Sequence, residues 1–562
     1  MKRNRLFRML VLAAASVLAL SAAGCGSGSN GGSASGSSSA ESGADASSAE
    51  ESAAESLQEE SVSAGSTAES AAESLPEELD RAAEIAALAA GADQQPAAAK
   101  ILVRGYEWGP GVPKLIVELP AEAEEVTWDS PVVAMAGTER VVSGFYLADE
   151  NGEPLEEEGP SKYAAIDFET NYANSGSPFT YDFMVTFMNN WSENYPVQAY
   201  FEATVDGAAT TFGLDADLIG SRICPDTDVF NERGEFTGDY TNPMTEETES
   251  ITLQYAAYMP ETLAGDGVKN PLIIWLHGQG EGGTDPDIAL LGNEVVALAK
   301  ENIQSRFGSE GGENGIYVLA CQTRTYWMDG GDGTNSNGDL VSRYTEALMD
   351  MIEKFVNEHE DIDANRIYLG GCSNGGYMTM NMLVQYPDYW AAAYPCCEAY
   401  SYYMYERNED GSYKTEVIPT DSWPITQYFP LEERWMSEEK VEAIKDIPIW
   451  FLQSADDTTV APASFGMPTY RALLKAGADN CWFSMFETVN GTDDNEGAQY
   501  MGHWSWVYLF NDQVTAVQDP EAVKASADDD ESFGFAPSNE GGGSLEANGF
   551  RNIFDWLNEQ SR

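Results

Sequence analysis

From about Pro243 onward, short apolar runs alternate with stretches of helical periodicity. The clearest apolar runs are Pro271–Leu276, Ile316–Ala320, Arg366–Leu369 and Ile449–Leu452. Continuous apolar strands that alternate with helices are typical of a mostly parallel sheet that is covered on both faces. We therefore expect residues 243–562 to form an α/β domain.

Residues 100–242 show a different pattern, in which apolar and polar residues alternate over short segments. Leu115–Leu119, Tyr181–Phe187 and Ala199–Val205 have this pattern, and Gly, Pro, Asn and Asp lie between them. Period-2 segments separated by turn residues predict an all-β sandwich. This part contains no histidine and one cysteine. We therefore expect it to position or oligomerise the rest of the chain rather than to supply chemistry.

The first 25 residues have the composition of an export signal. Four basic residues precede an apolar run from Met9 to Ala23, and its length of about 15 residues is less than a membrane span requires. Ala22, Ala23 and Gly24 precede Cys25, and small residues before a cysteine resemble the lipobox of bacterial lipoproteins. This resemblance implies an exported protein, anchored to the outer face of the cell membrane through lipid on Cys25. Plain secretion with cleavage near Ala23 is the alternative.

Residues 26–99 consist mainly of Ser, Ala, Gly and Glu and contain almost no aromatic residues. Such a segment buries too little apolar surface to offset the entropy that ordering costs. We therefore expect residues 26–99 to be a disordered tether that holds the folded part at a distance from its anchor.

Charge and residue spacing exclude several kinds of partner. The chain has 93 acidic and 29 basic residues and a formal net charge of -64. Nucleic acid is bound by clustered Lys and Arg, so it is not an expected partner. The six cysteines after Cys25 have no C-x-x-C spacing, and the acidic loops have no calcium-ligand spacing. We therefore expect free thiols, no metal site and no cofactor. One disulfide bridge, which an exported protein can form, is the alternative for the thiols.

A candidate nucleophile follows the strand Arg366–Leu369. Residues Gly371–Gly375 read Gly-Cys-Ser-Asn-Gly, and the following segment can continue as a helix. This is the G-x-S-x-G pattern in its strand–turn–helix setting, where the glycines allow a sharp turn that exposes the serine hydroxyl. The pattern predicts Ser373 as the nucleophile. The alternative is a glycine-rich turn with an idle serine.

A serine nucleophile requires a base, which is normally a histidine oriented by a carboxylate. The chain has three histidines. His359 lies in an acidic segment and is expected to be a solvated surface residue. His277 directly follows the apolar strand Pro271–Leu276, where enzymes with a serine nucleophile of this pattern have an oxyanion loop. His503 remains as the candidate base, and a histidine packed in a surface loop is the alternative for it.

Two adjacent aspartates follow the strand Ile449–Leu452. Many hydrolases read H-G-x-x-D-x-x-V at this point, and the segment Gln453–Val460 aligns the catalytic acid with Asp457. Asp456 is the alternative. The resulting chain order of serine, acid and histidine is that of the α/β-hydrolase triad.

Acyl transfer also needs donors that face the developing oxyanion. The backbone N–H of Asn374, directly after the candidate nucleophile, is the expected first donor. The loop after the first strand supplies the second, for which we favour the backbone of Gln279 over that of Gly280. A tight turn that only allows close packing is the alternative for this loop.

Several aromatic residues follow the strands of the α/β part. Tyr326, Trp327 and the run Tyr400–Tyr405 are candidates for the acyl pocket, with core packing as the alternative. The segment Cys397–Lys445 is long for a connection and is a candidate lid.

These motifs together resemble a known group of enzymes. Leu276–Gly283, the turn at Ser373, Asp457, Gly502-His503 and Phe554–Leu557 resemble the esterases and peptidases related to polyhydroxybutyrate depolymerases and feruloyl esterases. With Val103–Val112 ahead of them, they resemble lipoprotein or secreted esterases that have an N-terminal immunoglobulin-like domain. The resemblance covers residues 100–562. It implies an α/β-hydrolase fold, preceded by an immunoglobulin-like sandwich through which the chain could form a homo-oligomer.

The sequence therefore predicts a serine esterase that acts on a small-molecule or polymer-linked ester. The same residues would serve a peptidase or a polyester depolymerase, because the triad does not select its leaving group. A hypothesis from another class is a catalytically inactive lipoprotein that binds surface glycans.

Overall fold

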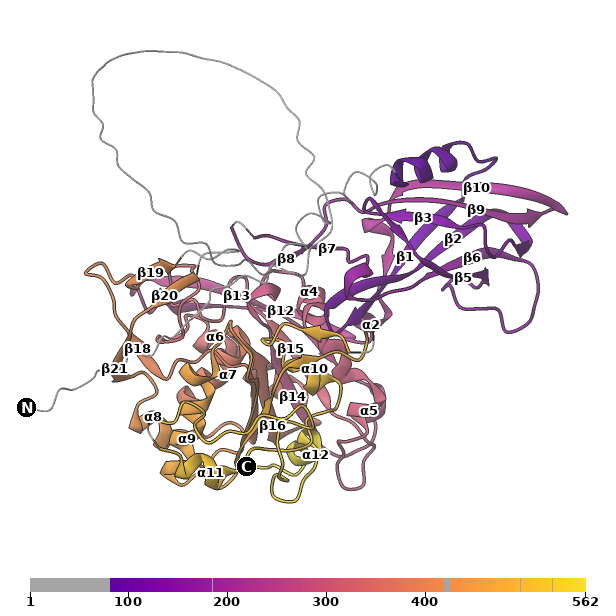
Figure 1. Cartoon of the computed structure of the whole chain (residues 1–562). Coiled ribbons are helices and arrows are strands. Elements are labelled where there is room, and N and C mark those ends of the chain that lie inside the picture. Colours follow the sequence, from indigo (N-terminus) through magenta and orange to yellow (C-terminus); the bar gives the residue numbers. More distant parts are fainter. Residues whose placement is uncertain (1–80, 184, 419–424, 496, 528) are drawn as a thin grey trace, which may run out of the picture.

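The computed structural model describes residues 81–562 except 184, 419–424, 496 and 528 (Figure 1). The expected signal segment, the lipidation site at Cys25 and the tether up to residue 80 lie outside the described residues. A β domain, drawn in indigo to purple, lies beside a larger α/β domain, drawn in magenta to yellow. Within the described part of the chain, no helix is long and apolar enough to cross a membrane.

The β domain contains a nine-stranded sheet. Its main path has the order β11-β1-β2-β9-β3-β4, while β10 pairs with β9 and β6 pairs with both β2 and β5. In β9, alternate residues from Val197 to Val205 are buried, as the period-2 pattern predicts. The strands are β1 (Ala98–Tyr106), β2 (Gly109–Val126), β3 (Val132–Met135), β4 (Thr138–Arg140), β5 (Val142–Ala148), β6 (Ser161–Phe168), β9 (Pro196–Val205), β10 (Ala208–Asp217) and β11 (Arg222–Ile223).

The segment Tyr181–Phe187, which the sequence predicts as a strand of this sheet, is mostly a turn. The Asp182 carboxylate accepts hydrogen bonds from the backbone N–H groups of Val185 (3.1 Å) and Thr186 (3.0 Å), which closes the chain on itself. The flanking strands β7 (Phe179–Tyr181) and β8 (Asn189–Trp191) form a separate hairpin. This hairpin projects from the β domain across the α/β domain (Figure 1).

The expected tether ends earlier than residue 99. Residues 81–90 form a helix, and within it Ile85 and Ala89 are buried. The helix packs against β10, because a Cβ atom at Gly213 would lie 1.9 Å from the carbonyl oxygen of Ala89. The sequence prediction was wrong here because the alanines favour a helix once a sheet surface is available to cover its apolar side.

The α/β domain is built on an eight-stranded sheet of order β12-β13-β15-β14-β16-β17-β22-β23. The pairings β12–β13 and β13–β15 are antiparallel, and the remaining pairings are parallel. The strands are β12 (Glu232–Thr241), β13 (Thr248–Tyr258), β14 (Asn270–Leu276), β15 (Tyr317–Gln322), β16 (Ile362–Cys372), β17 (Ala392–Cys396), β22 (Ile449–Ser454) and β23 (Cys481–Phe486).

The expected domain boundary at residue 242 is therefore wrong, because β12 belongs to the α/β sheet. In β12 partly buried and exposed residues alternate, as they would in a sandwich strand. This pattern arises because β12 is the edge strand of the sheet and has one face open to solvent.

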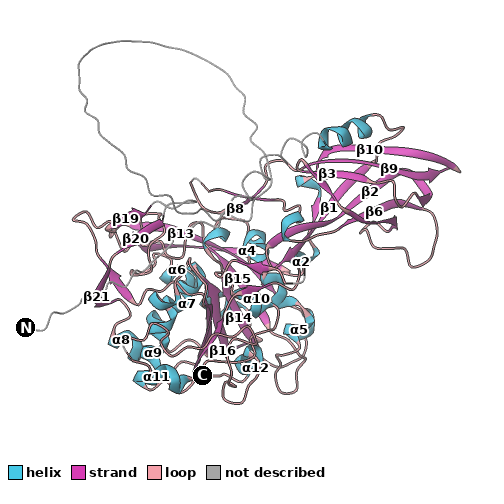
Figure 2. Cartoon of the chain, in the orientation of Figure 1, coloured by secondary structure: helices cyan, strands magenta, loops and turns pink. Residues whose placement is uncertain are grey.

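The central strands explain the apolar runs of the sequence. Every residue of β14, β15, β17, β22 and β23 is buried. Helices α7, α8, α9 and α11 lie on one side of the sheet, and α5 and α12 lie on the other (Figures 1 and 2). The helices are α4 (Pro286–Gly292), α5 (Glu301–Gln304), α6 (Thr345–Glu358), α7 (Asn374–Gln385), α8 (Glu438–Ile444), α9 (Gly466–Ala476), α10 (Trp506–Phe510), α11 (Pro520–Ala525) and α12 (Ile553–Asn558).

The two faces of the sheet pack into separate cores. One core joins Trp275, Tyr368 and α12 to the interior of the β domain, and the other joins Leu276 and Leu369 to α6 and α7. The β domain therefore shares a continuous apolar core with one face of the α/β sheet.

Candidate active site

Ser373 lies at a sharp turn between β16 and α7. Its backbone angles, φ 55° and ψ -111°, lie outside the regions that a non-glycine residue favours. Two glycines make room for the turn, because a Cβ atom would lie 2.4 Å from the carbonyl oxygen of Leu276 at Gly371 and 1.9 Å from it at Gly375. The elbow holds the Ser373 side chain partly exposed at the carboxyl end of the sheet.

His503 and Asp457 form a buried pair beside this elbow. Nδ1 of His503 lies 2.8 Å from Oδ2 of Asp457. The other Asp457 oxygen accepts hydrogen bonds from the backbone N–H groups of Thr459 and Val460, each at 2.9 Å. These bonds hold the carboxylate still, and His503 and Ser373 line the same cavity.

The adjacent Asp456 occupies a different environment. It is exposed, and its carboxylate accepts a hydrogen bond from the Ser454 hydroxyl. Of the two aspartates that the sequence leaves open, only Asp457 contacts His503 among the described hydrogen bonds.

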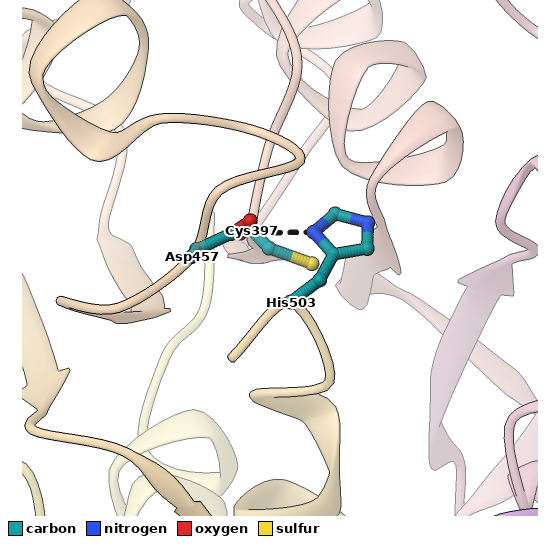
Figure 3. Close-up of side chains that lie close together, drawn as sticks. All are labelled: Cys397, Asp457 and His503. Atoms are coloured by element: carbon teal, nitrogen blue, oxygen red, sulfur yellow. Dashed lines mark hydrogen bonds and ion pairs between the residues drawn. The ribbon is translucent and has the colours of Figure 1, made fainter. Parts of the chain in front are cut away.

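A third side chain completes this cluster and was not anticipated from the sequence. The Cys397 sulfur, a carboxylate oxygen of Asp457 and a ring nitrogen of His503 all lie within 4.8 Å of one another, and all three residues are buried (Figure 3). Three such atoms have the spacing of metal ligands. However, Nδ1 of His503 is already bonded to Asp457, so we interpret the cluster as a proton-transfer pair with a thiol packed against it. The position of Cys397 directly after β17 is the feature of the sequence that could have indicated its place in this cluster.

The surroundings of His503 shift its proton affinity. Burial acts to lower the pKa of its imidazole, but the Asp457 carboxylate and the Cys397 side chain hold that pKa well above its usual value. The Asp457 carboxylate thus stabilises the imidazolium that forms when His503 accepts a proton.

The other two histidines are hydrogen-bonded to backbone or side-chain groups outside the His503–Asp457 pair. Burial lowers the pKa of His277 to about 4, so its ring is neutral. Its Nδ1 donates to the carbonyl of Gly278 (2.6 Å) and its Nε2 accepts from the N–H of Thr323 (3.2 Å), which fixes the start of the expected oxyanion loop. His359 is a partly exposed surface residue whose ring contacts the backbone carbonyl of Phe355 and the carboxylate of Glu232.

The expected oxyanion donors are held by a network of amide side chains. The Asn374 amide donates to Asn335, and the Asn335 amide donates to the side chain of Gln279, each at 2.9 Å. The Asn374 oxygen also accepts from the N–H of Met328 at 2.9 Å. Within the described residues, the backbone N–H groups of Gln279 and Asn374 have no hydrogen-bond acceptor. Gln279 lines the same cavity as Ser373, and Asn374 directly follows Ser373 in the chain, while Gly280 lies against Asn189 of the β domain.

The cavity at Ser373 is small, about 80 Å³, and both domains line it. This differs from the expectation that the β domain has no part in the chemistry, because Trp108, Phe179, Tyr181 and Asn189 form one wall. Trp504 and Trp506 line the cavity from the segment that holds His503. The sequence could have suggested these residues only through the unusual run Tyr106-Glu-Trp-Gly-Pro110.

The aromatic residues that the sequence nominated for the pocket lie elsewhere. Among the described residues, Tyr326, Trp327 and the run Tyr400–Tyr405 do not line this cavity. Trp327 is fully buried and packs on His277, with ring centres 5.2 Å apart, and Tyr326 donates to the carbonyl of Thr186 (2.6 Å). Core packing describes Tyr326, Trp327 and Tyr400 better, whereas Tyr402 and Tyr403 line a separate cavity. The described residues of the expected lid do not line the cavity either.

Two glutamates, Glu107 and Glu281, also line the cavity. Glu281 follows the candidate oxyanion loop and is buried, and burial raises its pKa to about 7. Its Oε1 accepts a hydrogen bond from Asn189 at 3.3 Å. The loop is therefore bonded to the hairpin of the β domain as well as to its own sheet.

A mixed sheet with a serine on the strand–helix elbow and a buried His–Asp pair beside it is the arrangement of the α/β-hydrolase fold. The family comparison agrees, since residues 335–496 match the prolyl oligopeptidase family. Over an alignment of 116 residues, which covers 19% of this chain, the sequence is 30% identical to poly(3-hydroxyalkanoate) depolymerase C of Paucimonas lemoignei. The chain spans about a quarter, 26%, of the length of that curated relative.

The fold also matches a solved structure across most of the chain. A thermostable esterase superposes with a TM-score of 0.54 and 20% identity, and the match covers 83% of this chain and 100% of the esterase. At this level of identity the match shows the fold. The fold and the sequence matches together support a serine hydrolase, which confirms the enzyme class expected from the sequence.

Proposed function

We propose that the chain is a serine esterase in which Ser373 is the nucleophile, His503 the base and Asp457 the residue that orients the base. The observation on which this depends is the His503–Asp457 bond of 2.8 Å beside the cavity that Ser373 lines. This arrangement pairs a base with its orienting carboxylate, as acyl transfer through a serine requires.

The reaction then follows from the positions of these groups. The Ser373 hydroxyl attacks the ester carbonyl while His503 accepts its proton. The oxyanion that develops is held by the backbone N–H groups of Gln279 and Asn374, and one such donor is typically worth about 10²–10³ in rate. The imidazolium returns its proton to the departing alcohol, and water, activated by His503, hydrolyses the acyl-enzyme.

The cavity supports a small acyl group as the preferred substrate. A volume of about 80 Å³ beside tryptophan and tyrosine rings supports an acetyl-sized acyl group. The similarity to a poly(3-hydroxyalkanoate) depolymerase supports an ester bond, including one in a polymer. A peptidase with the same triad is the second candidate, which the match to the prolyl oligopeptidase family favours. An inactive glycan-binding lipoprotein would not need the strained elbow at Ser373.

The remaining parts of the chain suit an exported enzyme. We include in the proposal that the β domain is immunoglobulin-like and contributes to assembly as a homo-oligomer. Residues 1–25 act as a lipoprotein signal, and lipid on Cys25 anchors the enzyme outside the cell. The Ser-, Ala- and Glu-rich composition of the following residues supports a tether.

The full-length chain should release p-nitrophenol from p-nitrophenyl acetate, and Ser373→Ala should abolish the release. A panel of acetyl, feruloyl, hydroxybutyrate and peptide substrates identifies the bond. Equal turnover by the wild type and Ser373→Ala would contradict the assignment of the nucleophile. Tight glycan binding without turnover would favour the binding protein instead.

A further inference from the structure

The turn between β1 and β2 places a carboxylate of the β domain inside the α/β domain. Glu107 is only 1% exposed. Its oxygens accept hydrogen bonds from the backbone N–H and the hydroxyl of Thr492, both at 2.7 Å, and from the N–H of Asp493 at 3.2 Å. They also accept from the Tyr500 hydroxyl at 2.9 Å and from the Asn511 amide. Four residues of the α/β domain therefore donate to one side chain of the other domain.

These donors lie on both sides of His503 along the chain. Tyr500 ends β25 (Gln499–Tyr500), three residues before His503. Asn511 directly follows α10, which begins three residues after His503. Glu107 thus connects the two ends of the segment that contains the proposed base.

Aromatic packing supports the same segment from the β domain. The Tyr172 ring contacts the rings of Tyr500 and Trp504, with centres 5.7 and 5.9 Å apart, and also contacts Trp108 at 6.4 Å. Trp504 is the residue after His503. The β domain therefore contacts the segment through both a buried charge and an aromatic cluster.

A buried carboxylate is a costly way to join two domains. In the described part of the chain, no Lys, Arg or His lies within ion-pair distance of Glu107. Its charge is thus compensated by the donors of Thr492 and Asp493 together with Tyr500 and Asn511 at the two ends of the His503 segment, and loss of the carboxylate would leave several of these donors unpaired. Apolar contacts alone could dock the domains. What the carboxylate adds is a fixed direction for each donor, and so a fixed path for the segment.

We propose that Glu107 is a positioning residue of the α/β domain's active site: it fixes residues 500–511 so that His503 faces Ser373 while remaining bonded to Asp457. This inference rests on the proposed role of His503 as the base. It makes the β domain a necessary part of the catalytic unit rather than a separable attachment.

The test compares variants of the full-length chain in p-nitrophenyl acetate hydrolysis. We expect Glu107→Gln to lower kcat at least tenfold with KM changed less than threefold, because the cavity wall remains while the base is misplaced. Glu122→Gln is the matched control, since Glu122 is exposed on β2 of the same domain. It should leave both constants unchanged.

A second readout follows His503 directly and does not depend on turnover. The chain has three histidines, so the downfield ring N–H proton bonded to Asp457 can be assigned by NMR with the help of His277 and His359 variants. We expect this signal to broaden or shift in Glu107→Gln and to be unchanged in Glu122→Gln. A loss of general stability alone would leave the signal of the folded fraction in place.

Tyr500→Phe keeps the ring and removes one donor, so it provides a test if Glu107→Gln does not fold. We expect Tyr500→Phe to lower kcat a few fold. If both single variants fold, their effects on kcat should be non-additive in the double variant. A folded Glu107→Gln, or failing that Tyr500→Phe, with wild-type kcat and an unchanged histidine signal would overturn the positioning role. If the wild type itself shows no turnover, the proposed function fails instead, and the histidine signal alone then decides the positioning role.

Discussion

His503 and Asp457 are joined by a 2.8 Å hydrogen bond although they lie 46 positions apart in the chain. The bond fixes which ring nitrogen of His503 bears the proton and leaves the other nitrogen available to a substrate hydroxyl or to Ser373. The exposed neighbour Asp456 makes no such bond among the described contacts.

Asp457→Asn should therefore lower kcat by about 10⁴-fold, because the amide favours the wrong tautomer of the imidazole. Asp456→Asn is the matched control and should stay within about twofold of the wild type, as is usual for surface changes. Initial rates with p-nitrophenyl acetate measure both. A larger loss in the Asp456 variant would reverse the assignment.

The pH dependence of kcat/KM should reflect the raised pKa of His503. The base must be neutral, so activity rises with pH through that pKa, and the acid limb should lie above pH about 6.5, the usual value for histidine. Cys397 contributes to the rise. Cys397→Ala should move the limb to lower pH and reduce the plateau by less than about tenfold, since the thiol is not the proposed nucleophile.

Cys224→Ala, which removes a buried thiol in the β domain, is the control for Cys397→Ala and should leave the limb in place. Complete loss of activity in Cys397→Ala, together with residual activity in Ser373→Ala, would make Cys397 the nucleophile.

Glu281 should make the folded state less stable as pH rises. Burial raises its pKa from 4.5 to about 7. Its contribution is therefore fully present below pH about 4.5 and is lost as pH rises through about 7, a difference of about 3 kcal/mol at most. Glu281→Gln should remove this dependence and unfold at higher denaturant concentration at pH 8 than the wild type. Denaturant unfolding at pH 5 and pH 8 measures it, and equal midpoints for the two proteins at both values would contradict the buried, protonated carboxyl.

Tyr181→Ala should weaken substrate binding without slowing the chemical step. Tyr181 lines the cavity from the β domain but contacts none of the proton-transfer residues among the described hydrogen bonds. We expect KM for aryl acetates to rise about 3- to 10-fold with kcat nearly constant, which is the sign of lost ground-state binding. Trp128→Ala, at an aromatic residue of the same domain that is 75% exposed, should change neither constant.

Gly375→Ala should disrupt the elbow. The new Cβ atom would lie 1.9 Å from the backbone oxygen of Leu276, which cannot move without displacing β14. We expect a loss of about 3 kcal/mol in the free energy of unfolding, or no soluble protein. Gly220→Ala, where nothing lies within 4 Å of the new atom, is the control. Urea unfolding of the two variants distinguishes a steric cause from a general cost of replacing glycine.

The sequence predicts local features well because their signals are local. The elbow needs glycines two residues on either side of Ser373, and the buried strands need continuous apolar runs, so both can be read within short windows. The α/β domain expected on this basis is confirmed by the eight-stranded sheet, and the fold comparison supports the α/β-hydrolase fold that the resemblance implies.

Relationships between distant segments could not be predicted in this way. The alternation in β12 is the same for a sandwich strand and for the edge strand of a mixed sheet, so the change of pattern near residue 243 put the predicted domain boundary after β12 instead of before it. Glu107 and Thr492 lie 385 positions apart, and nothing in either segment indicates the other. Helix 81–90 has the composition of a tether, and its contact with β10 is not visible in its own sequence.

The shared cavity wall has a consequence for how such an enzyme can diversify. Trp108 and Tyr181 shape the space around the substrate from the β domain, Trp108 from the turn between β1 and β2 and Tyr181 from β7, whereas Ser373, Asp457 and His503 all belong to the α/β domain. Descendants of this gene can therefore acquire new preferences through single substitutions at these two wall positions, while the bond-breaking apparatus of the other domain is inherited unchanged.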